Sequence, residues 1–285
     1  MKKSNYTFFL GGYDLEMVTI RDLLKKSGIP GENIIDKQLR WGAKVSQYSA
    51  EIAEARKQGR KLMLIELEND IELEGGDVVI IDHHDKNAGI DKPTSLEQIW
   101  RLLAMDPRQW GRSEYADYPL IAANDRGHVR AMKTLGATQN QMAAIRARDR
   151  AAQGITEEEE RQGKTAVANH EARCEGELIL VKLPHNHTAV VSDLLHADLG
   201  GPGYRNLLVI SPGEINFFGD GRWICGLDRT FPGGWYGGDL PREGYWGFNF
   251  AQPLVEWLES RISDTPPAGA GGFFTSSISR LSSGT

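Results

Sequence analysis

The stretch Asp77-Val-Val-Ile-Ile-Asp-His-His84 decides the fold class that this sequence predicts. A run of β-branched apolar residues between acids is typical of a short strand buried on both faces, as in a parallel sheet. Asp82, His83 and His84 follow directly at the carboxyl end of that strand. A carboxylate beside two imidazoles is a ligand set for a divalent metal ion, so the same stretch also indicates a site.

The first half of the chain alternates short apolar runs with segments of helical periodicity. Such alternation predicts βαβ units and a largely parallel sheet. Ser95 and Gln98 have the spacing of a capping box at the start of one predicted helix. The predicted strands are residues 6–10, 33–36, 61–67 and 77–81, and the predicted helices are residues 15–26, 45–58 and 95–105.

Several of these apolar runs end in an acid, and the run Leu120-Ile-Ala-Ala-Asn-Asp125 reads as a further strand of this kind. The ligand crevice of an open parallel sheet lies beyond the carboxyl ends of its strands, so Asp14, Glu66, Asp82 and Asp125 should converge. Converging carboxylates repel one another unless a cation lies between them. Oxygen and imidazole ligands suit Mn²⁺, Fe²⁺ or Zn²⁺ better than Ca²⁺. The plain structural alternative is that each acid is a helix N-cap or a turn residue.

The remainder of the chain divides by pattern. Helical periodicity, with a capping box at Thr156 and Glu159, is followed by strand patterns at residues 178–183, 206–211 and 215–218 and a last helix at 254–262. The predicted fold class is α/β, with a cleft between a mostly parallel N-terminal domain and a smaller α/β C-terminal domain. The predicted boundaries are 1–127 for the first domain, 128–176 for a helical connector, 177–263 for the second domain and 264–285 for a disordered tail.

Composition narrows the range of partners. The chain has 285 residues and a net charge of -6, from 33 basic and 39 acidic residues. Duplex nucleic acid is not expected as a partner, because binding it depends largely on phosphate neutralisation. There are only two cysteines and no run of about 18 apolar residues, so we expect a cytoplasmic protein without a disulfide framework or a membrane partner. The composition is compatible with a homo-oligomer.

The sequence resembles the DHH phosphoesterase family, which is named for its Asp-His-His motif. The resemblance rests on the strand before Asp82-His-His84, the upstream Gly11-Gly-Tyr-Asp-Leu-Glu16 and the downstream Ala122-Ala-Asn-Asp125, in the same order over roughly residues 5–130. The glycine-rich segment 233–238 resembles, more weakly, a signature of the DHH-associated C-terminal domain.

The resemblance implies a two-lobed hydrolase that uses Mn²⁺, as one or two ions, with other divalent metals as alternatives. Its substrate would be a small nucleotide or a short single-stranded molecule with phosphodiester or phosphoanhydride bonds. The residues implied as metal ligands are Asp14, Glu16, Glu66, Asp82, His83 and Asp125, with Asp82 bridging two ions and Glu68 as the alternative to Glu66. Those implied in catalysis are Asp82, His83 and His84.

Two further groups are candidates for binding the phosphorylated substrate. Arg126, His128 and Arg130 follow Asp125 directly, and basic side chains beside a metal site suit phosphate. Gly233, Gly234, Gly237 and Gly238 could bring backbone N–H groups close to a phosphate. The structural alternatives are ion pairs for the basic residues and simple turns for the glycines.

The sequence departs from the family at its first motif, which is His-x-Asp-x-Asp. Gly12 stands in place of the histidine and Glu16 in place of the second aspartate. The histidine of the glycine-rich signature also has no equivalent in 233–238. These departures support an alternative function, in which a catalytically degenerate protein binds a nucleotide or phosphate ligand as a sensor or regulatory subunit. A protein that reuses the fold only for interaction is a third hypothesis.

Overall fold

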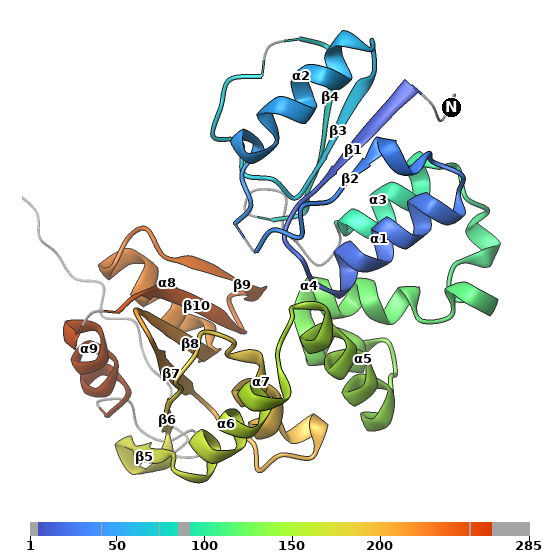
Figure 1. Ribbon diagram of the computed structural model, residues 1–285. Helices are drawn as coiled ribbons and strands as arrows, with labels where there is room; N and C mark the ends of the chain where they lie inside the picture. Colours follow the sequence, from blue (N-terminus) through green and yellow to red (C-terminus); the bar gives the residue numbers. More distant parts are fainter. Residues whose placement is uncertain (1–4, 41, 74, 85–91, 251, 264–285) are drawn as a thin grey trace, which may run out of the picture.

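The computed structural model describes residues 5–40, 42–73, 75–84, 92–250 and 252–263. Within these residues the chain forms two sheets with helices packed on them, which confirms the α/β class (Figure 1). The predicted tail at 264–285 lies outside the described residues.

The first sheet has four strands in the order β2-β1-β3-β4, and every pairing in it is parallel. Its strands are β1 (Tyr6–Leu10), β2 (Ile34–Ile35), β3 (Lys61–Ile65) and β4 (Val78–Ile81). Each of them falls within a predicted strand. The predicted parallel sheet is therefore confirmed.

Alternating side chains of the central strands enter two separate cores. Phe8 and Leu10 of β1 pack with helices α1 (Leu15–Lys26), α3 (Ser95–Leu102), α4 (Tyr118–Thr134) and α5 (Gln139–Ala152). Phe9 between them faces the other side, where α2 (Ser49–Lys57) covers the sheet. Because successive strand residues point to opposite faces, a run of three apolar residues supplies both cores.

The expectation that residues 78–81 form a strand buried on both faces is wrong. β4 lies at the edge of the sheet, and the side chains of Val79 and Ile80 are 40% and 55% exposed. A continuous apolar run shows that a strand belongs to a sheet, but it does not distinguish an edge strand from a central one.

Helices α4, α5 and α6 (Glu157–Ala168) precede the second sheet, and α4, which begins at Tyr118, crosses the predicted start of the connector at residue 128. α4 breaks at Gly127 and His128, whose backbone angles are not helical. The predicted capping box at Thr156 and Glu159 is confirmed. The capping box predicted at Ser95 and Gln98 is wrong. The observed box at the start of α3 is formed by Thr94 and Glu97, each one residue before the predicted member.

The second sheet has the order β5-β6-β7-β8-β10-β9, and only the β6–β7 pairing in it is parallel. Helices α8 (Gly221–Thr230) and α9 (Gln252–Ser263) cover one face, and α6 and α7 (Ala189–Leu195) cover the other. Its strands are β5 (Glu171–Arg173), β6 (Leu178–Lys182), β7 (Leu207–Ser211), β8 (Glu214–Asp220), β9 (Trp235–Asp239) and β10 (Glu243–Asn249).

The short 3-10 helices lie in the connections between these elements. They are η2 (Gly31–Asn33), η3 (Val45–Tyr48), η5 (Pro107–Gln109), η6 (Ser113–Tyr115), η7 (Cys174–Gly176) and η8 (Ala197–Leu199). In the part of the chain that the structure describes, no helix is both long and apolar enough to cross a bilayer.

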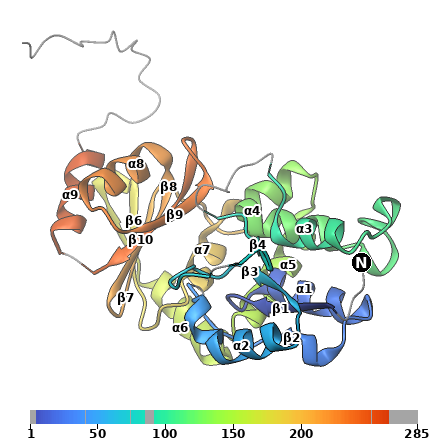
Figure 2. The same ribbon diagram turned by 90° about the horizontal axis from the view of Figure 1, so that it is seen from above.

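Helices α4 and α5 pack with the first sheet, and α7 packs on the second (Figures 1 and 2). α4 contacts β9, and α5 contacts α7. α4 therefore connects the first sheet, in sequence and in space, with the glycine-rich strand of the second.

Candidate metal centre

Acidic and imidazole side chains gather beyond the carboxyl ends of the first sheet. Asp14 and Glu16 begin α1 after β1, Glu66 follows β3, and His83 follows β4. Because parallel strands end at the same edge, Glu16, Glu66 and His83 are brought together there. Asp125 joins them from α4. The predicted convergence of four strand-end acids holds only in part, because Asp82 bonds to His84 instead.

Four ligand atoms converge at the imidazole of His83. Its Nε2 lies against Oδ2 of Asp125, 3.4 Å from Oε1 of Glu66 and 3.9 Å from Oε2 of Glu16. All four atoms are buried, and none of them forms a hydrogen bond of acceptable geometry. Buried polar atoms are almost always paired, so a group of orphan atoms that face one another points to a missing partner.

The charges of this cluster also fit a cation. Burial and the charges on Asp125 and Glu66 raise the pKa of Asp14 and of Glu16 well above the ordinary carboxyl value. Burial and the charge on Asp125 likewise raise the pKa of Glu66. Burial lowers the pKa of His83, but the Asp125 and Glu66 carboxylates outweigh it and raise the pKa. Three carboxyl oxygens and one imidazole nitrogen are the donor set of a divalent transition metal, and the residues present fit such an ion.

Proton binding to these carboxyls should compete with metal binding. A carboxyl whose pKa is raised in the folded protein contributes stability that is present at low pH and is lost as the pH rises through that pKa. We therefore expect the metal-free protein to lose stability as the pH rises above about 4, the ordinary carboxyl value. Mn²⁺ needs ionised ligands, so its stabilising effect should grow over the same range. Melting temperatures with Mn²⁺ and with chelator at pH 5 to 8 measure this; a constant difference would contradict it.

Local backbone geometry fixes two of the carboxylates. Oε1 of Glu16 accepts a hydrogen bond of 3.0 Å from the backbone N–H of Leu96, which leaves Oε2 for the cluster. Glu66 has a φ of 50°, in the left-handed region that glutamate seldom adopts. This turn follows β3 immediately, and the backbone of Glu66 packs closely against Gly11.

Gly11→Ala is expected to destabilise the protein and to weaken Mn²⁺ binding. A methyl group at Gly11 would come within 2.2 Å of the carbonyl oxygen of Glu66, so the strand end carrying Glu66 must shift. Overpacking of this kind costs about 1–3 kcal/mol. Chemical denaturation and Mn²⁺ titration measure the two effects. Gly31→Ala is the control, because nothing lies within 4 Å of a methyl group there; equal effects of the two substitutions would contradict the role of Gly11.

Asp14 lies beside the converging atoms but has a structural task as well. Its Oδ1 accepts a hydrogen bond of 2.8 Å from the backbone N–H of Met17, so it is the N-cap of α1. It is not part of either close-packed ligand group found here, namely Glu16, Glu66, His83 and Asp125, or Glu66, His83 and His84. Asp14 is therefore both a helix N-cap, as the structural alternative predicted, and a close neighbour of Asp125 and Glu66.

Asp82, the predicted bridge between two ions, faces His84. Its Oδ1 accepts a hydrogen bond of 3.0 Å from the His84 backbone N–H and lies 2.9 Å from Nδ1 of the same residue. Gln98, the other member of the misassigned capping box, donates from Nε2 to the Asp82 carbonyl oxygen at 3.0 Å. Asp82 is in neither ligand group, and its carboxylate orients His84.

The prediction that Asp125 ends a strand is wrong, because it lies in α4. Pro119 occupies the first turn of α4, where its missing N–H costs nothing, and Ala122 and Ala123 favour a helix. The apolar run 120–123 is too short for its periodicity to separate a strand from a buried helix. Asp125 still reaches the cluster, because the start of α4 packs in the same core as β1 and β3.

The basic residues Arg126 and Arg130 each have a protein partner. Arg126 forms an ion pair of 2.6 Å with Glu97, although its Nε is buried without a partner. Arg130 forms an ion pair of 2.7 Å with Glu243 of β10, across the two lobes. The structural alternative, ion pairing, therefore holds for both arginines.

His128 lies at the break in α4, with a φ of 49°. Its ring packs edge-on against Tyr245 of β10, and its Nδ1 lies 3.3 Å from Nη1 of Arg146. Burial and the Arg146 charge lower its pKa. His128 therefore contacts the second lobe three residues after Asp125.

The glycines at 233–238 form the turn before β9 and β9 itself, not a simple turn. A methyl group at Gly234 would come within 2.8 Å of the Trp246 ring, and one at Gly237 within 2.9 Å of the Tyr245 ring. A methyl group at Gly238 would meet the β10 backbone at 2.6 Å. Gly233, with a φ of 97°, has nothing within 4 Å. Packing against β10 thus explains three of these glycines, and only Gly233 has open space.

Sequence reasoning missed a buried polar network on the other side of Asp14. Arg146 of α5, which is 3% exposed, donates to Asp149 at 2.7 Å and to Asp193 of α7 at 2.9 Å. Asp149 in turn accepts from the backbone N–H of Leu15, the first residue of α1, at 3.2 Å. The available signal was an Arg-x-x-Asp pair beside Ile145 on the apolar face of a predicted helix.

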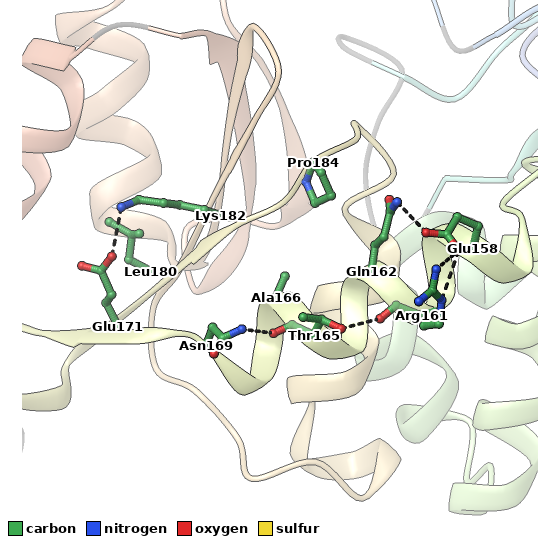
Figure 3. A pocket seen from close by; sticks show the side chains of 10 residues that line it. All are labelled: Glu158, Arg161, Gln162, Thr165, Ala166, Asn169, Glu171, Leu180, Lys182 and Pro184. Carbon is green, nitrogen blue, oxygen red and sulfur yellow. Dashed lines mark hydrogen bonds and ion pairs between the residues drawn. The ribbon is translucent and has the colours of Figure 1, made fainter.

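A surface pocket of about 450 Å³ lies apart from this cluster, in the second lobe (Figure 3). Its lining comes from α6, β5 and β6, and includes Arg161, Lys182 and Pro184. No residue of the acidic cluster lines it, so the pocket and the candidate metal centre are separate features.

Comparison with known proteins gives a distant structural likeness. No protein-family model matches the chain, and no curated protein matches it. A crystal structure of exonuclease RecJ bound to manganese superposes with a TM-score of 0.44 at 14% identity, covering 93% of this chain and 92% of that chain. Structures of RecJ from Thermus thermophilus in complex with Mn²⁺ and Mg²⁺ both give a TM-score of 0.43, at 16% and 15% identity, and each covers 92% of this chain. This chain spans about half the length of those two chains, 52% and 49%.

Proposed function

We propose that this protein is a divalent-metal-dependent phosphoesterase that hydrolyses a small nucleotide or a short single-stranded substrate. The observation that carries the proposal is the set of four buried ligand atoms that face one another at the strand ends and form no accepted hydrogen bond with the rest of the protein. The Asp82-His83-His84 motif in the same place supports it, because the sequence resembles the DHH phosphoesterases over this region.

Glu16, Glu66, His83 and Asp125 would hold the ion, with Asp14 beside them. Such an ion, when bound, supplies Lewis-acid chemistry that activates water and offsets negative charge on a phosphoryl group. Mn²⁺ is the proposed ion, since mixed carboxylate and imidazole ligands suit it. The protein's own contribution is a rigid, buried arrangement of charges. Positioning and electrostatic stabilisation of this kind account for most of the rate acceleration in enzymatic phosphoryl transfer.

His84 is the proposed hydrogen-bond donor to a phosphoryl or leaving-group oxygen. Burial lowers its pKa, but the paired Asp82 and the charges on Glu66 and Asp125 outweigh it and raise the pKa to about 9. Asp82 holds the imidazole ring from the Nδ1 side. Asp82 thus acts as a positioning residue in this proposal.

The substrate would extend from the cluster towards β9 and β10. His128 and Arg130 connect α4 to this hairpin through Tyr245 and Glu243. Gly233 has the open space that a phosphate needs, and the Tyr236 ring, 52% exposed, is available to stack on a base. Substrate phosphate would have to exchange with the partners of Arg126 and Arg130, and such exposed or half-buried ion pairs are weak.

A second candidate function is ligand binding without hydrolysis, as a nucleotide or phosphate sensor. Gly12 replaces the histidine of the family motif, and one oxygen of Glu16 is already bound by the Leu96 N–H. Both features reduce the number of ligand atoms on the α1 side of the cluster. The same assay separates the two candidates.

The test is Mn²⁺-dependent hydrolysis of a small panel: a generic phosphodiester, a linear dinucleotide, a cyclic dinucleotide, pyrophosphate and short polyphosphate. Asp125→Asn removes one ligand charge, and Asp117→Asn is the matched control, because Asp117 precedes the same helix in an exposed ion pair with Arg148. Turnover by the wild type and Asp117→Asn, but not by Asp125→Asn, supports the phosphoesterase. Mn²⁺ binding without turnover of any substrate favours the sensor.

A further inference from the structure

A second group of metal-ligating side chains lies outside the cluster described above. Glu159 of α6 and two histidines of the loop after β6, His185 and His187, place ligand atoms within 4.8 Å of one another. All three side chains are half-buried, so they are reachable from solvent. The segment Pro184-His-Asn-His187 has no role in the proposed phosphoesterase.

The distances in this group are those of ligands that share an ion. Nδ1 of His187 lies 2.9 Å from Oε1 of Glu159. Two atoms that bind one ion tetrahedrally at about 2.0–2.2 Å stand roughly 3.3–3.6 Å apart, so these two atoms would have to separate by only about half an ångström. The pair forms a hydrogen bond when no ion is present, and an ion can replace the shared proton without a large movement of either side chain.

His185 has the orientation of a metal-binding histidine. Its Nε2 lies 3.1 Å from the backbone carbonyl oxygen of Glu159, which can only accept, so Nε2 carries the proton and Nδ1 has the lone pair. An imidazole oriented by a carbonyl oxygen on one nitrogen and able to ligate through the other is the usual arrangement around protein-bound metals. The competing contact to Nδ1 is a long one, 3.2 Å from the His187 backbone N–H.

Glu159 is fixed in advance by the start of its helix. Its Oε2 accepts a hydrogen bond of 2.8 Å from the Thr156 backbone N–H in the capping box, which leaves Oε1 directed at His187. In the first turn of α6, Arg161 pairs with Glu158 and Arg150 pairs with Glu160. The Glu159 carboxylate between them has no arginine partner among the described contacts and faces His187.

We propose that Glu159, His185 and His187 form a second metal site, for Zn²⁺ or a similar transition ion. Two imidazoles and one carboxylate suit Zn²⁺, Co²⁺ or Ni²⁺ and do not suit Mg²⁺ or Ca²⁺. Three protein ligands leave one position for water or another ligand. The ion joins α6 of the connecting region to the β6–α7 loop, next to the pocket at Glu158 and Pro184 (Figure 3).

The test is Zn²⁺ titration of the untagged, chelator-stripped full chain, followed by calorimetry and by melting temperature. Because the first cluster can also bind Zn²⁺, binding at this site is measured as the stoichiometry and heat that each variant loses relative to the wild type. We expect wild type to bind Zn²⁺ at this site and to melt at a higher temperature with it. His187→Ala should weaken Zn²⁺ binding at least about 10-fold. Co²⁺ in place of Zn²⁺ should give a visible absorption band that the variant loses.

Two further variants keep the result decisive. Glu159→Gln preserves the capping box, since glutamine serves there as well as glutamate, and removes the ligand charge, so it should fold normally and still lose Zn²⁺ affinity. His170→Ala is the control, because His170 lies just past α6 and bonds only to a carbonyl oxygen of its own turn among the contacts described. Unchanged Zn²⁺ binding in both His187→Ala and Glu159→Gln, or an equal loss in His170→Ala, would overturn the proposal.

Discussion

Glu16→Gln is expected to weaken Mn²⁺ binding by about 100-fold or more and, in the absence of metal, to make the protein more stable. The metal loses an anionic ligand, while the metal-free protein no longer contains a buried carboxyl whose ionised form is disfavoured by burial and by Asp125 and Glu66. Glutamine keeps the oxygen that accepts from Leu96 and places an amide where Oε2 now has no partner. Relief of an unsatisfied buried group is worth about 1–3 kcal/mol.

Mn²⁺ titration and chemical denaturation in chelator, both at neutral pH, measure the two opposite effects. Glu68→Gln is the matched control, because Glu68 lies two residues after Glu66 but is an exposed partner of Lys44. We expect neither quantity to change in that control. A Glu16→Gln protein that binds Mn²⁺ as tightly as the wild type would remove Glu16 from the ligand set. A metal-free variant less stable than the wild type would show that the cluster is not strained by its own charge.

Arg146→Met is expected to destabilise the protein by about 3–5 kcal/mol. Arg146 is almost completely buried and pairs with Asp149 and Asp193. Its loss leaves the buried Asp149 without its counter-charge and leaves Asp193 with Arg150 alone. The effect should reach the metal centre, because Asp149 also holds the N-terminus of α1 through Leu15. Denaturant unfolding measures the loss of stability, and Mn²⁺ titration of the folded variant measures the effect on the metal centre.

Arg148→Met on the same helix is the control. Arg148 pairs with Asp117 at the surface, with side chains 47% and 57% exposed, and such pairs contribute little. We expect a change of less than about 1 kcal/mol in that variant. Similar losses of stability in the two variants would mean that methionine itself destabilises this helix. The buried network would then contribute no more stability than the surface pair.

Those parts of the fold that depend on local pattern could be predicted. The bounds of β1 and α1 match the predicted ranges at both ends, because a short apolar run is followed by clear helical periodicity. The helix α8 was missed, because Asp220-Gly221 reads as a turn, whereas Asp220 is the N-cap of a helix in which its side chain accepts from Arg222. β9 and β10 were likewise missed, because their glycines hide the alternation of a strand.

The convergence of Glu66 and His83 could be predicted for the same reason, since parallel strands fix where their ends meet. The position of Asp82 could not, because a side chain at a strand end can turn towards the crevice or back onto its own chain, and Asp82 bonds to His84 two residues later. The Arg146 network was out of reach, because its members come from α4, α5 and α7, and sequence spacing says nothing about which distant helices pack together.

The break in α4 places a two-residue pivot between the two lobes. One stiff rod ends near Asp125, and a second begins after His128 and carries Arg130 to its contact with β10. A continuous helix would fix the angle between the lobes, whereas a two-residue pivot lets that angle vary through a few backbone torsions while each rod stays intact. The distance from the carboxylates of the cluster to the β9–β10 hairpin can then change. We therefore expect substrates of different size to alter the angle between the lobes and to leave the interior of each lobe unchanged.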